Sequence, residues 1–167
     1  MIGFCPGAEF GPAKRWPHYH YAELAKQLID EGYQVVLFGS AKDHEAGNEI
    51  LAALNTEQQA WCRNLAGETQ LDQAVILIAA CKAIVTNDSG LMHVAAALNR
   101  PLVALYGPSS PDFTPPLSHK ARVIRLITGY HKVRKGDAAE GYHQSLIDIT
   151  PQRVLEELNA LLLQEET

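Results

Sequence analysis

The sequence predicts an α/β fold, a Rossmann-like doubly wound parallel sheet with helices on both faces. Apolar runs and segments with helical spacing alternate about six times along the chain, and the runs are apolar enough to be buried on both faces. Right-handed crossovers then favour the strand order 3-2-1-4-5-6. Because no internal repeat, low-complexity tract or linker interrupts this pattern, we expect residues 1–167 to form one domain.

The first strand and helix are predicted at the start of the chain. Residues 1–5 are apolar and have no preceding cap, and a core strand that starts at residue 1 suggests a piece of a longer protein. A glycine-rich loop at 6–16 follows. Pro17 suits the first turn of a helix, and apolar residues then recur with helical spacing until Gly32 ends the helix.

The second and third strands are predicted from shorter apolar runs. Residues 34–38 form the second strand, and the crossing at 39–43 leads into a helix that ends near Leu54. Residues 57–63 are expected to be helical or irregular. The third strand is then predicted at 64–67, where the apolar run is brief.

The second half of the chain contains the most regular pattern. Its predicted elements are a helix at 71–81, a strand at 84–85, a turn cluster at 86–90, a helix at 89–98, a strand at 102–106 and a strand at 122–127. The polar segment 128–146 is not assigned. Thr150 and Pro151 begin a last helix, whose apolar face is formed by Val154, Leu155, Leu158, Leu161 and Leu162.

Composition excludes several classes of protein. A net charge of −5 argues against nonspecific binding to nucleic acid, which needs a basic surface. The apolar runs are shorter than the about 18 residues of a transmembrane helix. Cys5, Cys62 and Cys81 are too far apart for a zinc knuckle and odd in number for a disulfide scaffold. Cys5 and Cys81 sit in apolar runs, so we expect buried thiols in a reducing cytoplasm.

Polar residues follow two strands that the predicted order makes neighbours, the first and the fourth. Ligands bind open α/β sheets where the strand order reverses, so the loop 6–16 and the turn 86–90 should line one crevice. The first N–H groups of a helix carry a partial positive charge that suits phosphate. The residues expected around such a ligand are Lys14, Asp88, Ser89, Gly90, Leu91 and His93.

Each of these residues also has a purely structural interpretation. Lys14 can be a solvated surface lysine, Asp88 or Ser89 can cap the helix at a gain of about 1 kcal/mol, and His93 can be a packing residue. We favour a shared ligand site over the alternative in which all of these residues have only structural roles. The loop at 6–16 matches neither standard phosphate-loop motif.

Two other chemistries are disfavoured. Ser89 lacks the G-x-S-x-G context of a nucleophilic serine. His18 and His20 alternate along a helix and therefore do not share a face. We predict no metal site.

Three stretches carry a resemblance to a known family: GAEFGPAKRWP, NDSGLMHVAAALNRPLVALYGPSSP and GYHQSL…ITPQRV. They resemble the ADP-heptose:lipopolysaccharide heptosyltransferases of Gram-negative bacteria, with the branch that adds the second heptose of the inner core as the best match. The resemblance covers essentially the whole chain, as the carboxyl-terminal half of such an enzyme. The chain has Glu9 and Phe10 where some relatives carry hydroxyl residues.

The resemblance implies a GT-B arrangement of two facing Rossmann-like domains. This chain would be the domain that binds the nucleotide sugar ADP-heptose, and the amino-terminal acceptor domain would be absent. By position, the diphosphate would contact Lys14 and the N–H groups of Ser89, Gly90 and Leu91; Asp88 and His93 would lie by the heptose or its phosphate; Asp43 would reach the ribose; and Thr69 and Gln70 would border the adenine.

The resemblance also implies an inverting displacement at the anomeric carbon, with ADP leaving. Lys14, Asp88 and His93 would then lie nearest the chemistry, while the general base, an acidic residue, would belong to the missing half. The implied acceptor is the inner core of lipopolysaccharide, bound through that half. No tightly bound cofactor is implied, and a dependence on Mg²⁺ is left open.

We therefore expect a cytoplasmic protein, peripheral at the inner membrane, that binds the donor without turning it over as an isolated chain. Two alternatives stay open. The chain can be half of another nucleotide-sugar transferase or epimerase, which a preference for UDP would indicate. It can also be a nucleotide-binding module without chemistry.

Overall fold

The sheet has the strand order that the sequence predicts. The computed structural model describes residues 1–8, 11–112, 115–128 and 140–166, and within them six strands form one sheet in the order β3-β2-β1-β4-β5-β6, with every pair parallel. The strands are β1 (Ile2–Cys5), β2 (Val35–Leu37), β3 (Cys62–Asn64), β4 (Ala83–Asn87), β5 (Leu102–Tyr106) and β6 (Ala121–Arg125).

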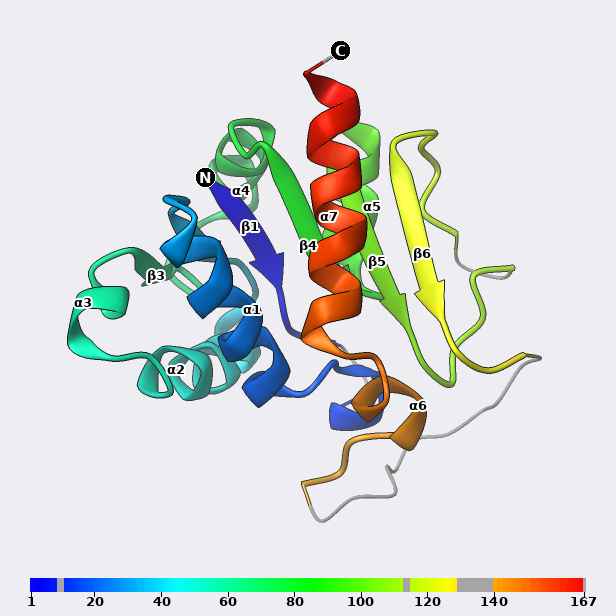
Figure 1. The fold of residues 1–167 in the computed structure, drawn as a ribbon, viewed down its shortest axis with the longest axis horizontal. Coiled ribbons are helices and arrows are strands. Elements are labelled where there is room, and N and C mark those ends of the chain that lie inside the picture. The colour runs from blue at the N-terminus through cyan, green and yellow to red at the C-terminus, as the bar shows by residue number, and fades with distance from the viewer. Residues whose placement is uncertain (9–10, 113–114, 129–139, 167) are drawn as a thin grey trace.

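Helices cover both faces of this sheet. They are the short 3-10 helices η1 (Pro12–Lys14) and η2 (Ala41–Asp43) and the α-helices α1 (His18–Asp30), α2 (His44–Ala52), α3 (Thr56–Gln59), α4 (Leu71–Ala79), α5 (Gly90–Ala97), α6 (Gln144–Ile147) and α7 (Pro151–Glu165). In Figure 1, α1 and α7 lie in front of the sheet and α4 and α5 behind it. The sheet thus separates two buried apolar clusters, one under α1 and α7 and one under α4 and α5.

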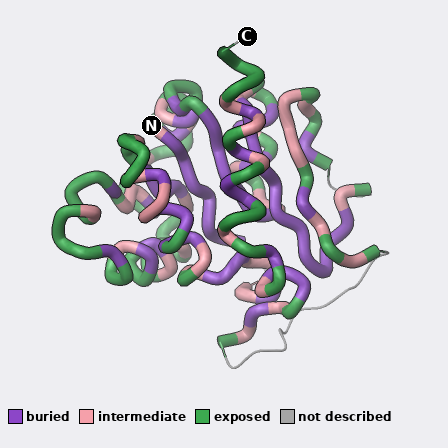
Figure 2. The backbone as a smooth tube through the Cα atoms, viewed as in Figure 1, coloured by how far each residue is buried: buried purple, intermediate pink, exposed green. Residues whose placement is uncertain are grey.

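The helix signals in the sequence are confirmed where they are strongest. Gly32 ends α1 with a φ of 94°, a conformation that favours glycine. Thr150 caps α7, since its side-chain oxygen accepts a hydrogen bond from the Arg153 N–H at 3.2 Å. The inner side of α7 is buried while its outer side is exposed (Figure 2), and Leu162 lies half-buried at the border.

The predictions for the two edge strands are wrong in their limits. β3 lies at Cys62–Asn64 rather than 64–67, so 62–63 is strand and not helix, and β6 ends at Arg125 rather than at 127. The neighbouring strands set these limits. β3 ends where β2 ends, and β6 stops opposite Tyr106, the last residue of β5. Of the unassigned segment 128–146, residues 129–139 lie outside the described residues, and α6 occupies part of the rest.

The three cysteines are buried free thiols, as predicted for Cys5 and Cys81. Burial raises the pKa of Cys5 to about 12 and the pKa of Cys62 and Cys81 to about 11. Because the thiolate is the reactive form, we expect iodoacetamide at pH 8 to leave all three unmodified in the folded protein and to label all three in guanidinium. Mass spectrometry gives the count, and labelling of the folded protein would contradict this burial.

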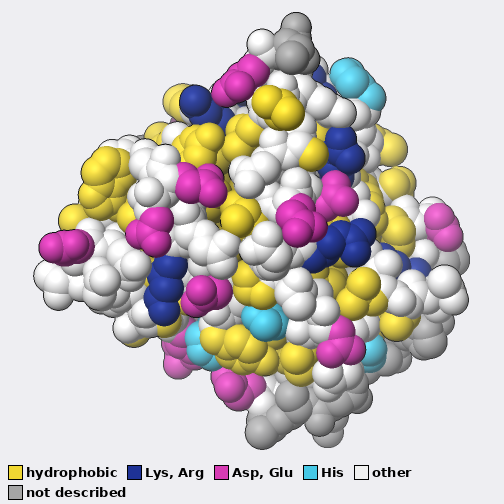
Figure 3. Space-filling view, viewed as in Figure 1, with side chains coloured by type: hydrophobic (Ala, Val, Ile, Leu, Met, Phe, Trp, Pro, Cys, Tyr) yellow, Lys and Arg dark blue, Asp and Glu magenta, His cyan; other side chains and the backbone are white. Residues whose placement is uncertain are grey.

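The face covered by α1 and α7 carries basic and acidic side chains side by side (Figure 3). Two ion pairs tie β6 and its preceding turn to α7: Arg122–Glu157 at 3.4 Å and Lys120–Glu165 at 3.1 Å. Among the described residues, no helix combines the length and the apolar character needed to cross a membrane.

Candidate functional site

A cleft of about 760 Å³ lies at the carboxyl edge of the sheet, at the place where the strand order reverses. Four successive connections line it: those after β1, β2, β3 and β4. The residues are Cys5, Gly7, Ala8, Gly11, Arg15, Phe38, Gly39, Ser40, Lys42, Asp43, Thr69, Leu71, Ala74, Ser89, Gly90, Leu91 and Val94. The loop after the first strand and the turn after the fourth therefore share one cleft.

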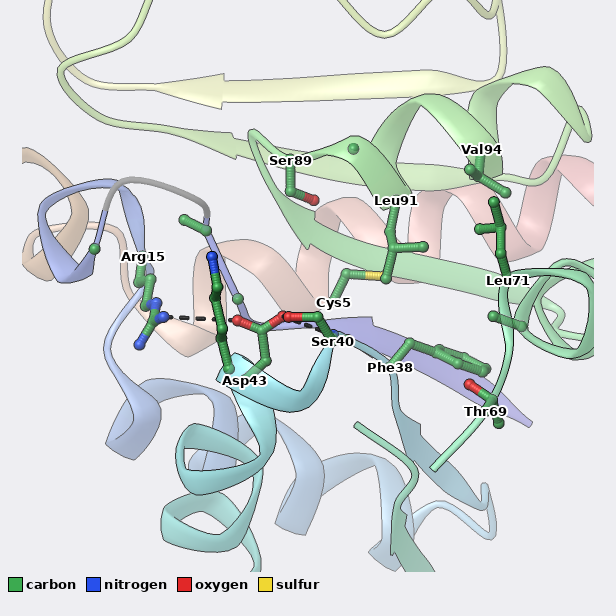
Figure 4. A pocket seen from close by; sticks show the side chains of 17 residues that line it. Cys5, Arg15, Phe38, Ser40, Asp43, Thr69, Leu71, Ser89, Leu91 and Val94 are labelled. Carbon is green, nitrogen blue, oxygen red and sulfur yellow. Dashed lines mark hydrogen bonds and ion pairs between the residues drawn. The ribbon is translucent and has the colours of Figure 1, made fainter. Parts of the chain in front are cut away.

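The cleft has a polar end and an apolar end (Figure 4). Arg15, Ser40 and Asp43 gather at one end, and Phe38 and Leu71 lie at the other. Phe38 is 1% exposed and forms a fixed wall, whereas Leu71 is 67% exposed. An apolar slot beside a polar end suits a flat heterocycle joined to a charged group.

The predicted site residues divide into two groups. Asp43, Thr69, Ser89, Gly90 and Leu91 line the cleft, whereas Lys14, Gln70, Asp88 and His93 are outside its lining as the described residues form it. Lys14 is the half-buried last residue of η1, and His93 is exposed on α5. Gln70 is the exposed N-cap of α4, and Asp88 is half-buried before the N-cap of α5. Glu9 and Phe10 lie outside the described residues.

The start of α5 forms one wall of the cleft. Ser89 takes the N-cap position with extended backbone, yet its side chain makes no capping hydrogen bond. Its hydroxyl lies 3.4 Å from the Thr86 hydroxyl instead. The N–H groups of the first turn of α5 are therefore not capped by this side chain, which suits a ligand that brings its own oxygen atoms.

Asn87 holds the loop after β1 in place, a role that the sequence did not reveal. Its side chain is fully buried, and its Oδ1 accepts hydrogen bonds from the Trp16 N–H at 3.0 Å and the Tyr21 hydroxyl at 2.9 Å. Its Nδ2 donates to the Pro6 carbonyl at 2.7 Å and the Gly7 carbonyl at 3.3 Å. In the sequence Asn87 looks like a turn residue, because only the structure continues β4 that far.

Asp43 and Arg15 connect the loops after β1 and β2. The Oδ2 of Asp43 accepts hydrogen bonds from the N–H and the hydroxyl of Ser40 at 2.9 and 3.1 Å, and its Oδ1 lies 3.6 Å from Nη2 of Arg15. Gly7 and Gly39 flank this carboxylate so closely that a Cβ at either position would overlap it. The sequence pattern does not single out Arg15, although it stands next to the predicted Lys14.

One group among the described residues could hold a metal ion, and it lies outside the lining of the cleft. The potential ligand atoms of His18, Glu49 and Glu140 lie within 4.8 Å of one another. Nδ1 of His18 is also 2.8 Å from the Tyr142 hydroxyl. His20 instead contacts the Ile147 carbonyl at 2.8 Å, and both histidines thereby bind α1 to the segment before α7.

Comparison with known proteins decides the family. The model of glycosyltransferase family 9 (heptosyltransferase) matches residues 1–143. The chain belongs to this family. The match runs from β1 through β6 to the residue before α6, so it includes every connection that lines the cleft.

This family 9 chain is 93% identical over 165 residues to lipopolysaccharide heptosyltransferase 2 of Salmonella typhimurium, covering 99% of the chain and 47% of that protein. A solved structure of Escherichia coli ADP-heptose lipopolysaccharide heptosyltransferase II matches with a TM-score of 0.93 and 93% identity, covering 100% of the chain and 47% of that one. An E. coli heptosyltransferase solved with ADP shares the fold, with a TM-score of 0.73 and 24% identity over 96% of the chain and 43% of its own. The family 9 chain thus spans about half the length of these proteins.

Proposed function

We propose that this chain is the donor-binding half of an inverting glycosyltransferase, heptosyltransferase II, which moves L-glycero-D-manno-heptose from ADP-heptose to the inner core of lipopolysaccharide. The observation that carries the proposal is the cleft, whose apolar end suits a base and whose polar end meets the start of α5. The relative at 93% identity is a lipopolysaccharide heptosyltransferase 2, which supports the choice of substrate.

The donor would lie along the cleft with its adenine at the apolar end. Thr69 and Gln70 would border the base, and Asp43 would reach the ribose. The diphosphate would contact the N–H groups of Ser89, Gly90 and Leu91 and the side chain of Lys14, with Asp88 and His93 beside the heptose. The positions of Thr69, Asp43 and Ser89 around one cleft support this placement. Lys14, Gln70, Asp88 and His93 would need to turn toward the donor.

The chemistry asked of these residues is stabilisation of the leaving group. Negative charge grows on the diphosphate as the bond to the anomeric carbon breaks, so fixed N–H groups and a cation bind the transition state more tightly than the ground state. In the complete enzyme we expect Lys14→Ala to lower the rate about a hundredfold. The general base would come from an amino-terminal acceptor domain, so this chain alone should bind donor without transferring heptose.

The first experiment is a calorimetric titration of the chain with ADP and with UDP, each with and without Mg²⁺, repeated with Lys14→Ala. We expect a preference for ADP that the substitution weakens. A preference for UDP would instead favour another nucleotide-sugar enzyme, and transfer of heptose by the chain alone would contradict the assignment of the base to another domain. Binding of neither nucleotide, here and in the complete enzyme, would contradict the cleft assignment. We also propose a cytoplasmic location, peripheral at the inner membrane where the lipid acceptor lies.

A further inference from the structure

Arg15 is a partly buried arginine at the polar end of the cleft. It follows η1 in extended conformation. The next residue, Trp16, is held in place because its backbone N–H donates a hydrogen bond to Asn87 and its side chain is only 1% exposed. The backbone that carries Arg15 is therefore anchored on its carboxyl side. Figure 4 shows the guanidinium at the polar end of the cleft, directed toward Asp43.

Among the described residues, the Arg15 guanidinium has few hydrogen-bond partners for a partly buried charged group. Its side chain is 22% exposed, and its contact with Asp43 is an ion pair of 3.6 Å, longer than a good hydrogen bond. Its Nε is buried and has no hydrogen-bond partner among the described residues. A guanidinium offers five N–H donors in a rigid fork, so an oxygen-rich anion would complete bonds that the described residues leave unmade.

The charges around the cleft also favour an anion. Among the described residues, the charged ones that line the cleft are Arg15, Lys42 and Asp43, so this part of the lining is net positive in a chain whose net charge is −5. Asp43 already uses its Oδ2 on Ser40 and turns its Oδ1 to Arg15. Asp43 therefore orients the guanidinium at the polar end of the cleft, but the Nε–H of Arg15 still has no hydrogen-bond partner among the described residues.

We propose that Arg15 binds the diphosphate of the nucleotide donor through its planar fork, with Asp43 as the residue that orients it. The inference rests on the proposed function and adds to it a residue that specifies the diphosphate. A guanidinium can bind two phosphate oxygens at once, which a lysine ammonium cannot do in a fixed geometry. The opposite wall, the start of α5, would hold the remaining oxygens.

The test compares ADP with adenosine, which has the base and ribose but no phosphate. Calorimetric titrations of the wild type, Arg15→Gln, Arg15→Lys and Arg153→Gln give the four pairs of dissociation constants. Arg153 is the matched control, since it forms an ion pair of 3.9 Å with Glu157 on α7 and is not among the residues that line the cleft. We expect Arg15→Gln to weaken the binding of ADP about tenfold to a hundredfold and to leave the binding of adenosine unchanged. The affinity of Arg15→Lys for ADP should lie between those of Arg15→Gln and the wild type, and Arg153→Gln should bind both ligands as the wild type does.

The outcomes separate the two proposals. If the wild type binds ADP but Arg15→Gln binds it equally well, the assignment of Arg15 fails and the proposed function stands. If Arg15→Gln weakens the binding of ADP and of adenosine equally, Arg15 is a structural link between the loops and the inference is overturned. If neither the wild-type chain nor the complete enzyme binds either ligand, the proposed function fails and the assignment of Arg15 fails with it.

Discussion

Replacing Asn87 by alanine is expected to cost about 4 kcal/mol of folding free energy and to lower the melting temperature by about 10 °C. The substitution removes all the hydrogen bonds of a fully buried side chain. It leaves the Trp16 N–H, the Tyr21 hydroxyl and the Pro6 carbonyl buried without that partner. Each such group costs about 1–3 kcal/mol, and urea unfolding followed by circular dichroism measures the sum.

Two further variants make this result specific. Tyr21→Phe removes one donor and leaves Asn87 its other partners, so we expect a loss of about 1 kcal/mol. Asn159→Ala changes an exposed asparagine of α7 and should stay within about 0.5 kcal/mol of the wild type. Equal stability of Asn87→Ala and Asn159→Ala would mean that Asn87 does not hold the loop.

Replacing Trp16 by alanine is expected to cost a similar amount, about 3–5 kcal/mol. The indole is 1% exposed and packs edge-on against Tyr21 with ring centroids 4.8 Å apart. Its Nε1–H donates to the Ile149 carbonyl at 2.8 Å, just before α7 begins. The substitution thus opens a large cavity and releases the segment that leads into α7. Urea unfolding followed by far-ultraviolet circular dichroism gives the free energy.

The other tryptophan of the chain is the control. Trp61 is 45% exposed, and we expect Trp61→Ala to cost less than about 1 kcal/mol. Trp16→Phe keeps a ring in the core but removes the Nε1–H, so its loss of unfolding free energy should lie between those of Trp16→Ala and Trp61→Ala. An equal loss of unfolding free energy in Trp16→Ala and Trp61→Ala would contradict the anchoring role of Trp16.

The fold is predictable from the sequence where a local signal and the global fold agree. The buried strands β1 and β5 are apolar throughout, β4 is apolar up to Val85, and the turn residues before α5 mark its start, so the strand order and the place of the cleft follow from the sequence. The limits of β3 and β6 did not follow, because an edge strand extends only as far as its single neighbour. These limits depend on residues far away in sequence.

The site residues show the same division. Ser89, Gly90 and Leu91 were found because a helix start after a buried strand is a local pattern. The sequence does not distinguish Arg15 from its neighbour Lys14, because the direction of a side chain at the end of a 3-10 helix cannot be inferred from composition. Asn87 was overlooked because burial of a polar side chain is visible only when all of its partners are assembled.

The position of β1 in the middle of the sheet affects how the chain is made. β1 pairs with β4, and the loop after β1 is held by Asn87, about 80 residues further along. While the ribosome synthesises the protein, β1 and its loop must wait for β4, because contacts between distant residues form only after the intervening chain exists. The cleft is therefore completed only after the chain has been made through α5, and its glycine-rich loop exists well before the residue that holds it.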